Sequence, residues 1–176
     1  SEVSGVRPYV DLGSLKLIPR EGLNLRLEVE EGSGRVVAVA MDYQGSTLQV
    51  QAFASTRSQG LWHEVRSQLS EQITAQGGSV EEALSELGPE LLSKVPALVD
   101  GQQVFQEVRF IGVDGPRWFL RGVIAGPAAT NPEQGKQLVE LFRDIVIVRG
   151  QQPMPPRELM PLKVPEQAAG IAPTQR

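Results

Sequence analysis

The chain has 176 residues, a net charge of −4 and an isoelectric point near 5.1, with 40% hydrophobic and 22% charged residues. This composition is ordinary for a globular protein, and the length suits one domain with a tail. The absence of cysteine excludes disulfides, thiolate nucleophiles and cysteine-based zinc sites. The acidic charge provides no basic field, so we expect no nucleic-acid partner. No apolar run approaches the ~20 residues of a membrane helix and no signal peptide is evident, so we expect a cytoplasmic protein without a membrane partner.

Three strands are predicted after an extended N-terminal arm. Residues 1–22 carry Pro8 and Pro19 around short apolar patches, so we expect an arm that lies against the domain. The next segment alternates between leucine or valine and polar side chains, which is the period of a half-buried strand. Glycine-containing turns separate it from two further strand-like runs. The three predicted strands, 23–30, 35–43 and 46–54, form an antiparallel meander.

The hydrophobic period then changes to that of a helix. Apolar side chains recur at helical spacing from about Gln59, at Leu61, Trp62, Val65, Leu69 and Ile73. Ser58 is a suitable N-cap and Gly77-Gly78 a suitable stop. We expect this helix to lay its apolar stripe on the sheet.

Two interpretations stay open for residues 79–98. Ser79 and Glu82 have the spacing of a capping box, which favours a short helix. Gly88-Pro89 would end that helix, and residues 90–98 could instead form another strand.

The stretch 104–123 is predicted to be a central β-hairpin. Two apolar-rich runs flank Asp114-Gly115, a dipeptide favoured in two-residue type I′ turns because both residues adopt positive φ. A turn there pairs Phe110 with Phe119, and the two rings share one face of the sheet. The opposite face then holds Ile111, Trp118 and Leu120. Apolar groups on both faces indicate strands that are covered on both sides.

A second helix has a well-formed start. Asn131 is placed as the N-cap, Pro132 occupies the first helical position, and the helix is expected over 133–144. The β-branched run 145–148 that follows is typical of a buried strand.

Prolines dominate the C-terminal segment, with six in the last 26 residues. They exclude regular structure, but the apolar side chains between them are too numerous for a free linker, so we expect the segment to pack on the domain. The expected organisation is an arm (1–22), a single α/β domain (23–150), a packed Pro-rich segment (151–165) and a disordered tail (166–176).

Three segments carry a resemblance to a known family: VRFIGVDGPRWFLRGVIAG, LQVQAFASTRSQGLWHEVR and LFRDIVIVRGQQPMPPRELMPL. They resemble an actinobacterial family catalogued as domain of unknown function 3710, and the resemblance runs from about Tyr9 to Pro165. That family has no assigned activity, so the resemblance implies no catalytic residues. The order of predicted elements also resembles the Mog1/PsbP-like sandwich, whose members are mostly non-catalytic adaptors. We therefore expect an α+β fold, in which helices flank an antiparallel sheet of about six to seven strands.

Residue types that commonly carry catalysis are sparse. His63 is the single histidine, and a helix-surface role suits it better than a triad or metal site. The acidic clusters at 28–31 and 81–82 lack the spacing of a calcium loop, and the glycine pairs do not match a nucleotide-binding loop. We expect no catalytic residue, metal or cofactor, although an enzymatic role stays open.

The hairpin arginines are the best candidates for contact with a ligand or partner. Arg117 and Arg121 fall on the same strand face as Phe119, with Phe110 across from it. Charged groups on a covered face must be paired or hydrated. If helix 133–144 covers this face, its carboxylates pair with the arginines; if the face is open, the arginines bind something external. The carboxylates available for such pairing include Glu140 and Asp144. We expect pairing for Arg121 and external contact for Arg117.

Two functions from different classes remain. The leading hypothesis is a non-catalytic cytoplasmic adaptor that binds another protein. The alternative is a small-anion-binding protein or an enzyme that uses arginines and carboxylates on the sheet face. A filled core between helices and sheet would favour the adaptor, whereas an open pocket with converging polar groups would favour the alternative.

Overall fold

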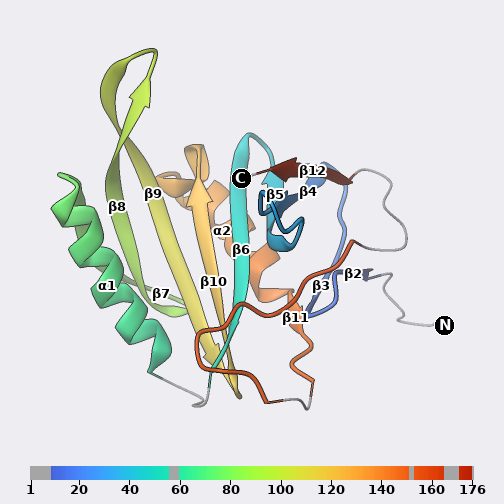
Figure 1. Ribbon diagram of the computed structural model, residues 1–176. Coiled ribbons are helices and arrows are strands. Elements are labelled where there is room, and N and C mark those ends of the chain that lie inside the picture. The colour runs from blue at the N-terminus through green and yellow to red at the C-terminus, as the bar shows by residue number, and fades with distance from the viewer. Residues whose placement is uncertain (1–8, 56–59, 151–152, 165–170, 176) are drawn as a thin grey trace.

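The fold is built on one large β-sheet. The computed structural model describes residues 9–55, 60–150, 153–164 and 171–175. Within them the large sheet has eight strands in the order β12–β4–β5–β6–β10–β9–β8–β7, all antiparallel except the pair β12 and β4 (Figure 1). The strands are β4 (Leu23–Val29), β5 (Val36–Tyr43), β6 (Ser46–Ala54), β7 (Ser79–Ser85), β8 (Gly88–Val99), β9 (Gln102–Gly115), β10 (Trp118–Ala125) and β12 (Ile171–Gln175). The meander predicted from residues 23–54 is confirmed.

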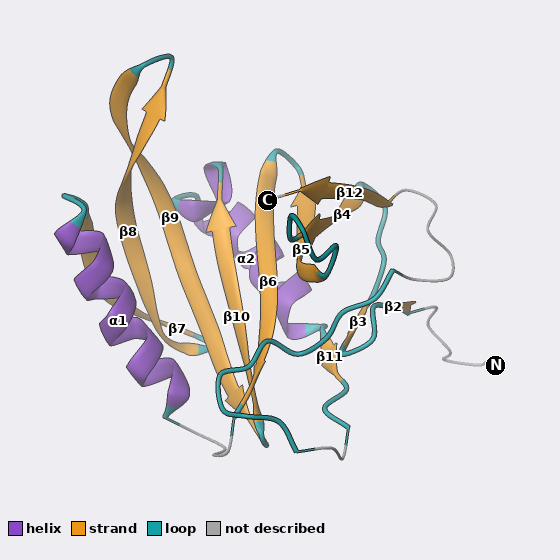
Figure 2. Cartoon of the chain, viewed as in Figure 1, coloured by secondary structure: helices purple, strands orange, loops and turns teal. Residues whose placement is uncertain are grey.

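Two α-helices lie on opposite faces of this sheet, as Figure 2 shows: α1 (Leu61–Ala75) and α2 (Pro132–Arg143). Phe119 of β10 packs against α1, whereas its neighbour Leu120 belongs to the cluster that contains α2. Adjacent strand residues point to opposite faces, so the two helices cover different sides. The α+β class with a sheet flanked by helices is therefore confirmed.

The helix starts follow from local chemistry. Asn131 caps α2 and accepts a hydrogen bond from the backbone N–H of Gln134 at 3.1 Å, as its position predicts. A short 3₁₀-helix, η1 (Pro127–Ala129), precedes it. The residue before α1 is Gly60, and the expected N-cap Ser58 lies outside the described residues.

Part of the N-terminal arm belongs to a second, three-stranded sheet. Its strands are β2 (Val10–Asp11), β3 (Leu15–Leu17) and β11 (Val146–Ile147), in the order β11–β3–β2. The N-terminal segment buries the side chains of Leu12, Leu15 and Leu17 in the main core. A strand does form within the predicted range 145–148, but it is not buried: β11 is two residues long and lies at the edge of the small sheet beside β3, and Val146 and Val148 are exposed.

The open question at residues 79–98 is resolved in favour of strands. β7 and β8 pair from Ser79↔Lys94 to Ser85↔Gly88, so the short helix suggested by the capping-box spacing does not form. A local capping signal is worth about 1 kcal/mol, and pairing along a whole strand outweighs it.

The central hairpin exists, but its turn lies two residues further along than predicted. Phe119 pairs with Asp114 rather than with Phe110, and the loop between β9 and β10 consists of Pro116 and Arg117. Arg117 has φ 67°, the positive value that a type II turn requires at the position after proline. Asp114 stays in the strand because its carboxylate accepts the backbone N–H of Trp62 at 3.2 Å and so caps α1.

The described part of the Pro-rich segment, residues 153–164, crosses the sheet as an ordered strap (Figure 1). Its backbone pairs with the end of β6 that lies beyond the β5–β6 pairing. Arg157 N–H donates to Ala54 O, and Met160 N–H donates to Ala52 O, both at 2.8 Å. The side chain of Met160 is only 1% exposed. Met160 and Leu162 of the segment therefore belong to the main core, whereas Val164 is exposed.

The C-terminal tail departs from expectation. Residues 166–176 are predicted to be disordered, but Ile171–Gln175 pair in parallel with β4 as strand β12. The unpaired edge of β4 offers backbone hydrogen bonds to any extended segment that reaches it, which composition alone does not reveal. Residues 165–170 and 176 lie outside the described part of the chain. Neither described helix has the length and apolarity needed to cross a membrane.

Candidate functional site

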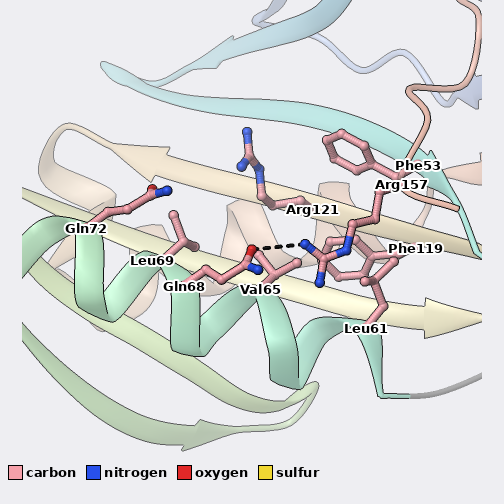
Figure 3. A pocket seen from close by; sticks show the side chains of 9 residues that line it. All are labelled: Phe53, Leu61, Val65, Gln68, Leu69, Gln72, Phe119, Arg121 and Arg157. Carbon is pink, nitrogen blue, oxygen red and sulfur yellow. Dashed lines mark hydrogen bonds between the residues drawn. The ribbon is translucent and has the colours of Figure 1, made fainter.

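A pocket of about 210 Å³ opens between α1 and the strands β6 and β10 (Figure 3). It forms because α1 lies over the outer half of its sheet face, on β7, β8 and β9, and only its inner flank overhangs β10. The lining residues are Phe53, Leu61, Val65, Gln68, Leu69, Gln72, Phe119, Arg121 and Arg157.

The floor of the pocket is aromatic. Phe53 and Phe119 are directly opposite each other in the β6–β10 pair, with ring centroids 6.1 Å apart. Phe119 also stacks on Trp62 at 5.7 Å, which anchors the floor to α1. Gly112 makes this stack possible, since a Cβ there would come within 2.6 Å of the Trp62 ring. The floor is therefore held against α1 by stacked rings.

The helix wall changes from apolar to polar along α1. Leu61, Val65 and Leu69 follow the four-residue spacing of one helix face and point at the sheet. Gln68 and Gln72, on the neighbouring line of the helix, bring amide groups to the solvent side of the pocket, as Figure 3 shows. The pocket thus has an apolar interior and a polar mouth.

Two arginines from different segments supply positive charge to this mouth. Arg121 of β10 donates to the Gln51 side chain, and its guanidinium lies 5.7 Å from the Phe53 ring centroid. Arg157 of the strap donates to Gln68 Oε1 at 3.0 Å and is 3.6 Å from a carboxylate oxygen of Glu64 (Figure 3). Arg157 therefore links the strap to α1 beside the pocket.

Polar side chains continue from Arg121 across the same face of the sheet. Arg26 donates two hydrogen bonds to the Asp42 carboxylate, at 2.5 and 2.9 Å, and the Thr47 hydroxyl donates a third at 2.6 Å. The bonds from Arg26 and Thr47 hold the pKa of Asp42 below its ordinary value, and the Asp42 hydrogen bond raises the pKa of Arg26. Arg26, Asp42 and Thr47 bond to one another, so the pocket is the better candidate for a ligand site on this face.

The four residues predicted for contact are only partly brought together. Phe119 and Arg121 line the pocket, and Phe110 packs beneath α1 in the same aromatic cluster. Arg117 does not join them, because it sits in the β9–β10 turn, where its carbonyl accepts hydrogen bonds from Ser55 N–H and the Arg149 side chain.

The expectation that helix 133–144 pairs with Arg121 is wrong. α2 covers the other face of the sheet, and Arg121 donates a hydrogen bond to the side-chain oxygen of Gln51. Asp144 instead lies 3.6 Å from Arg20. On the α2 face, the mostly buried side chain of Arg109 pairs with the carboxylate of Glu90.

The pocket also contains Phe53, Gln68, Gln72 and Arg157, which were not among the predicted contact residues. The two glutamines share a helix face with the predicted apolar stripe, so their spacing could have placed them at its edge. Arg157 has no such signal, because only the path of the strap brings it to the pocket.

Other chemistry is sparse in the described residues. His63 is exposed, and its Nδ1 lies 3.3 Å from an Arg66 nitrogen. No three histidine, aspartate or glutamate side chains of the described part converge in a way that could hold a metal ion.

The fold and site together define an α+β domain with a small pocket under its first helix. Over residues 1–170 the chain matches a family described as a protein of unknown function, DUF3710, and it belongs to that family. No curated protein and no solved structure shows significant similarity to it.

Proposed function

We propose that this protein is a binding domain for a small anion with an apolar body, held in the pocket under α1. The observation that carries the proposal is the presence of two guanidinium groups, Arg121 and Arg157, at a pocket whose floor is the Phe53–Phe119 pair. A largely apolar concavity with a few placed polar groups is the usual form of a small-molecule site.

The size and charge of the pocket narrow the ligand class. Its volume of about 210 Å³ exceeds the roughly 150 Å³ that accepts benzene, but falls below the ~300 Å³ of sites for drug-sized ligands. Guanidinium groups recognise carboxylates through paired hydrogen bonds. An aromatic or branched carboxylic acid of about ten heavy atoms fits both constraints.

Binding, rather than catalysis, is the chemistry that the lining supports. Among the nine described lining residues, none carries a carboxylate, imidazole or hydroxyl group that could act as a general base or nucleophile. The lining of the pocket therefore favours the anion-binding hypothesis over a pure adaptor role. A protein-interaction role has a different support, the exposed end of the β8–β9 hairpin.

The test measures binding of benzoate by NMR titration of the backbone amides. The expected dissociation constant is about 1 mM or tighter, which corresponds to roughly 0.5 kcal/mol per heavy atom. The shifted amides should belong to α1, β10 and the strap. Benzyl alcohol tests the need for charge, and inorganic phosphate tests the need for an apolar body; both should bind at least ~10-fold more weakly.

Three variants complete the test. Arg121→Gln and Arg157→Gln should each weaken benzoate binding several-fold, and Leu69→Trp should block the pocket while leaving both arginines in place. Arg143→Gln is the matched control, because Arg143 is an exposed arginine of α2 whose ion-pair partner is Glu86. Equal affinity for benzyl alcohol, or binding that all three pocket variants leave intact, would contradict the proposal.

We further propose that the order of elements is of the Mog1/PsbP type and that the chain is of actinobacterial origin. The first rests on a largely antiparallel sheet in which the β9–β10 hairpin is followed by α2 and then by the short strand β11, although β11 belongs to the second sheet. An experimental structure whose topology departs from that fold would refute it. The proposed cytoplasmic location rests on the absence of cysteine, and fractionation of the native host would test it.

A further inference from the structure

The outer end of the β8–β9 hairpin projects from the sheet as a free arm. Pairing of β8 with β7 ends at Lys94, and pairing of β9 with β10 ends at Val108, so among the described strands residues 95–106 pair only with one another (Figure 1). We call residues 95–106 the arm. Isolated two-stranded ribbons are marginally stable in water, so a feature that covers the arm would stabilise it.

The arm exposes large apolar side chains. Leu98 is 77% exposed and Phe105 is 56% exposed. Both fall on the side of the ribbon that continues the α2 face, since Phe105 is opposite Pro96 and Leu98 is opposite Gln103 in the pairing register. Clustered apolar side chains on a projecting element are typical of an association surface.

The same side of the arm contains a matching depression. Pro96, Ala97, Leu98 and Gln103 line a shallow hollow of about 160 Å³, comparable to the roughly 150 Å³ that accepts a benzene ring. Phe105 stands across the ribbon from this hollow, because its cross-strand partner is Pro96. One side of the arm therefore presents both an aromatic ring and a hollow of suitable size for such a ring.

The charges at the base of the arm are also complementary. Lys94 and Glu107 are cross-strand partners on the same side, both exposed, and neither makes an ion pair with another described residue. A twofold rotation about an axis along the ribbon exchanges the positions of β8 and β9. It therefore places Lys94 of one copy on Glu107 of the other, and Phe105 of each copy over the Pro96 hollow of the other.

We propose that the arm is a self-association element, whose partner is a second copy of this chain stacked face to face along it. The ring-and-hollow match and the charge match require the same rotation, and this agreement selects a second copy over an unrelated protein. The arm supplies far fewer than the 20–30 residues per side of a standard interface, so the dimer is weak and transient. The proposal is independent of the ligand pocket, which lies under α1.

The test begins with sedimentation of the full chain over the micromolar range, which should show a monomer–dimer equilibrium. Phe105→Ser should weaken the dimer at least ~10-fold, because the ring that fills the hollow is lost. Val104→Ser is the matched control: Val104 is the adjacent exposed residue but points to the other side of the ribbon. Circular dichroism of each variant checks that the fold is retained.

A charge exchange separates contact between copies from pairing within one copy. Lys94→Glu and Glu107→Lys should each weaken the dimer several-fold by placing like charges together. An equimolar mixture of the two variants should form a heterodimer at least as tight as the wild-type dimer, since both contacts between copies are then attractive while each variant keeps its own like-charged pair. A monomer throughout the micromolar range, a dimer that Phe105→Ser leaves intact, or a mixture that does not pair would overturn the proposal.

Discussion

Removal of the Glu90 carboxylate should lower the free energy of unfolding, because it leaves the buried charge of Arg109 unpaired. Glu90 Oε2 accepts a hydrogen bond from Arg109 Nε at 2.9 Å and forms an ion pair with Arg109 Nη2 at 2.8 Å. The two side chains are 7% and 14% exposed, so Glu90→Ala leaves a guanidinium without its counter-ion in a mostly dehydrated site. Breaking one partner of such a pair costs about 3–5 kcal/mol. A groove of about 440 Å³ beside the pair admits water, so we expect a value near the lower end, about 3 kcal/mol.

The double replacement Glu90→Leu with Arg109→Met should be far less costly than either single change. Two apolar side chains of similar length remove both charges, and such exchanges are often close to neutral. Denaturant unfolding of the two single variants and the double variant gives a thermodynamic cycle.

The matched control is Glu86→Ala, which breaks the exposed pair of Glu86 with Arg143 at 3.3 Å and should cost less than ~1 kcal/mol. A loss below ~1 kcal/mol for Glu90→Ala would mean that water already solvates Arg109, and the reasoning from burial would fail.

Three other outcomes are expected. The Arg26 hydrogen bonds lower the pKa of Asp42 below its ordinary 3.8, so their contribution to stability is present above about pH 4 and is lost as pH falls through the lowered pKa. Asp42→Asn should therefore cost about 1 kcal/mol at neutral pH and progressively less as the pH falls through the lowered pKa, and a cost that does not change with pH in denaturant unfolding would refute this. His63→Ala should change the free energy of unfolding by less than ~0.5 kcal/mol, since the ring is exposed; a loss above ~1 kcal/mol would show a larger role. Truncation after Gly150 removes the buried Met160 side chain and should cost at least ~2 kcal/mol, visible as a lower melting temperature, whereas an unchanged melting curve would mean that the strap adds nothing.

Elements whose signals are local were predictable from the sequence. The alternation in 23–30 specifies which side chains β4 buries, because a strand's side-chain period does not depend on its neighbours. The start of α2 was predictable for the same reason, since Asn131 satisfies backbone groups within one turn of itself. The shared face of Phe110 and Phe119 also survived the error in the turn, because a shift of two residues preserves the alternation between faces.

Features that depend on distant partners were decided only by the tertiary structure. The β9–β10 turn moved because Asp114 caps a helix that begins 53 residues earlier, at Leu61, and β7 is a strand because β8 offers it an edge. Arg121 lies beside α1 rather than under the predicted helix 133–144, and Arg157 reaches the pocket only through the path of the strap. Periodicity specifies which side of an element is apolar, but the choice of what covers that side depends on contacts between residues far apart in the chain, which no short stretch of sequence records.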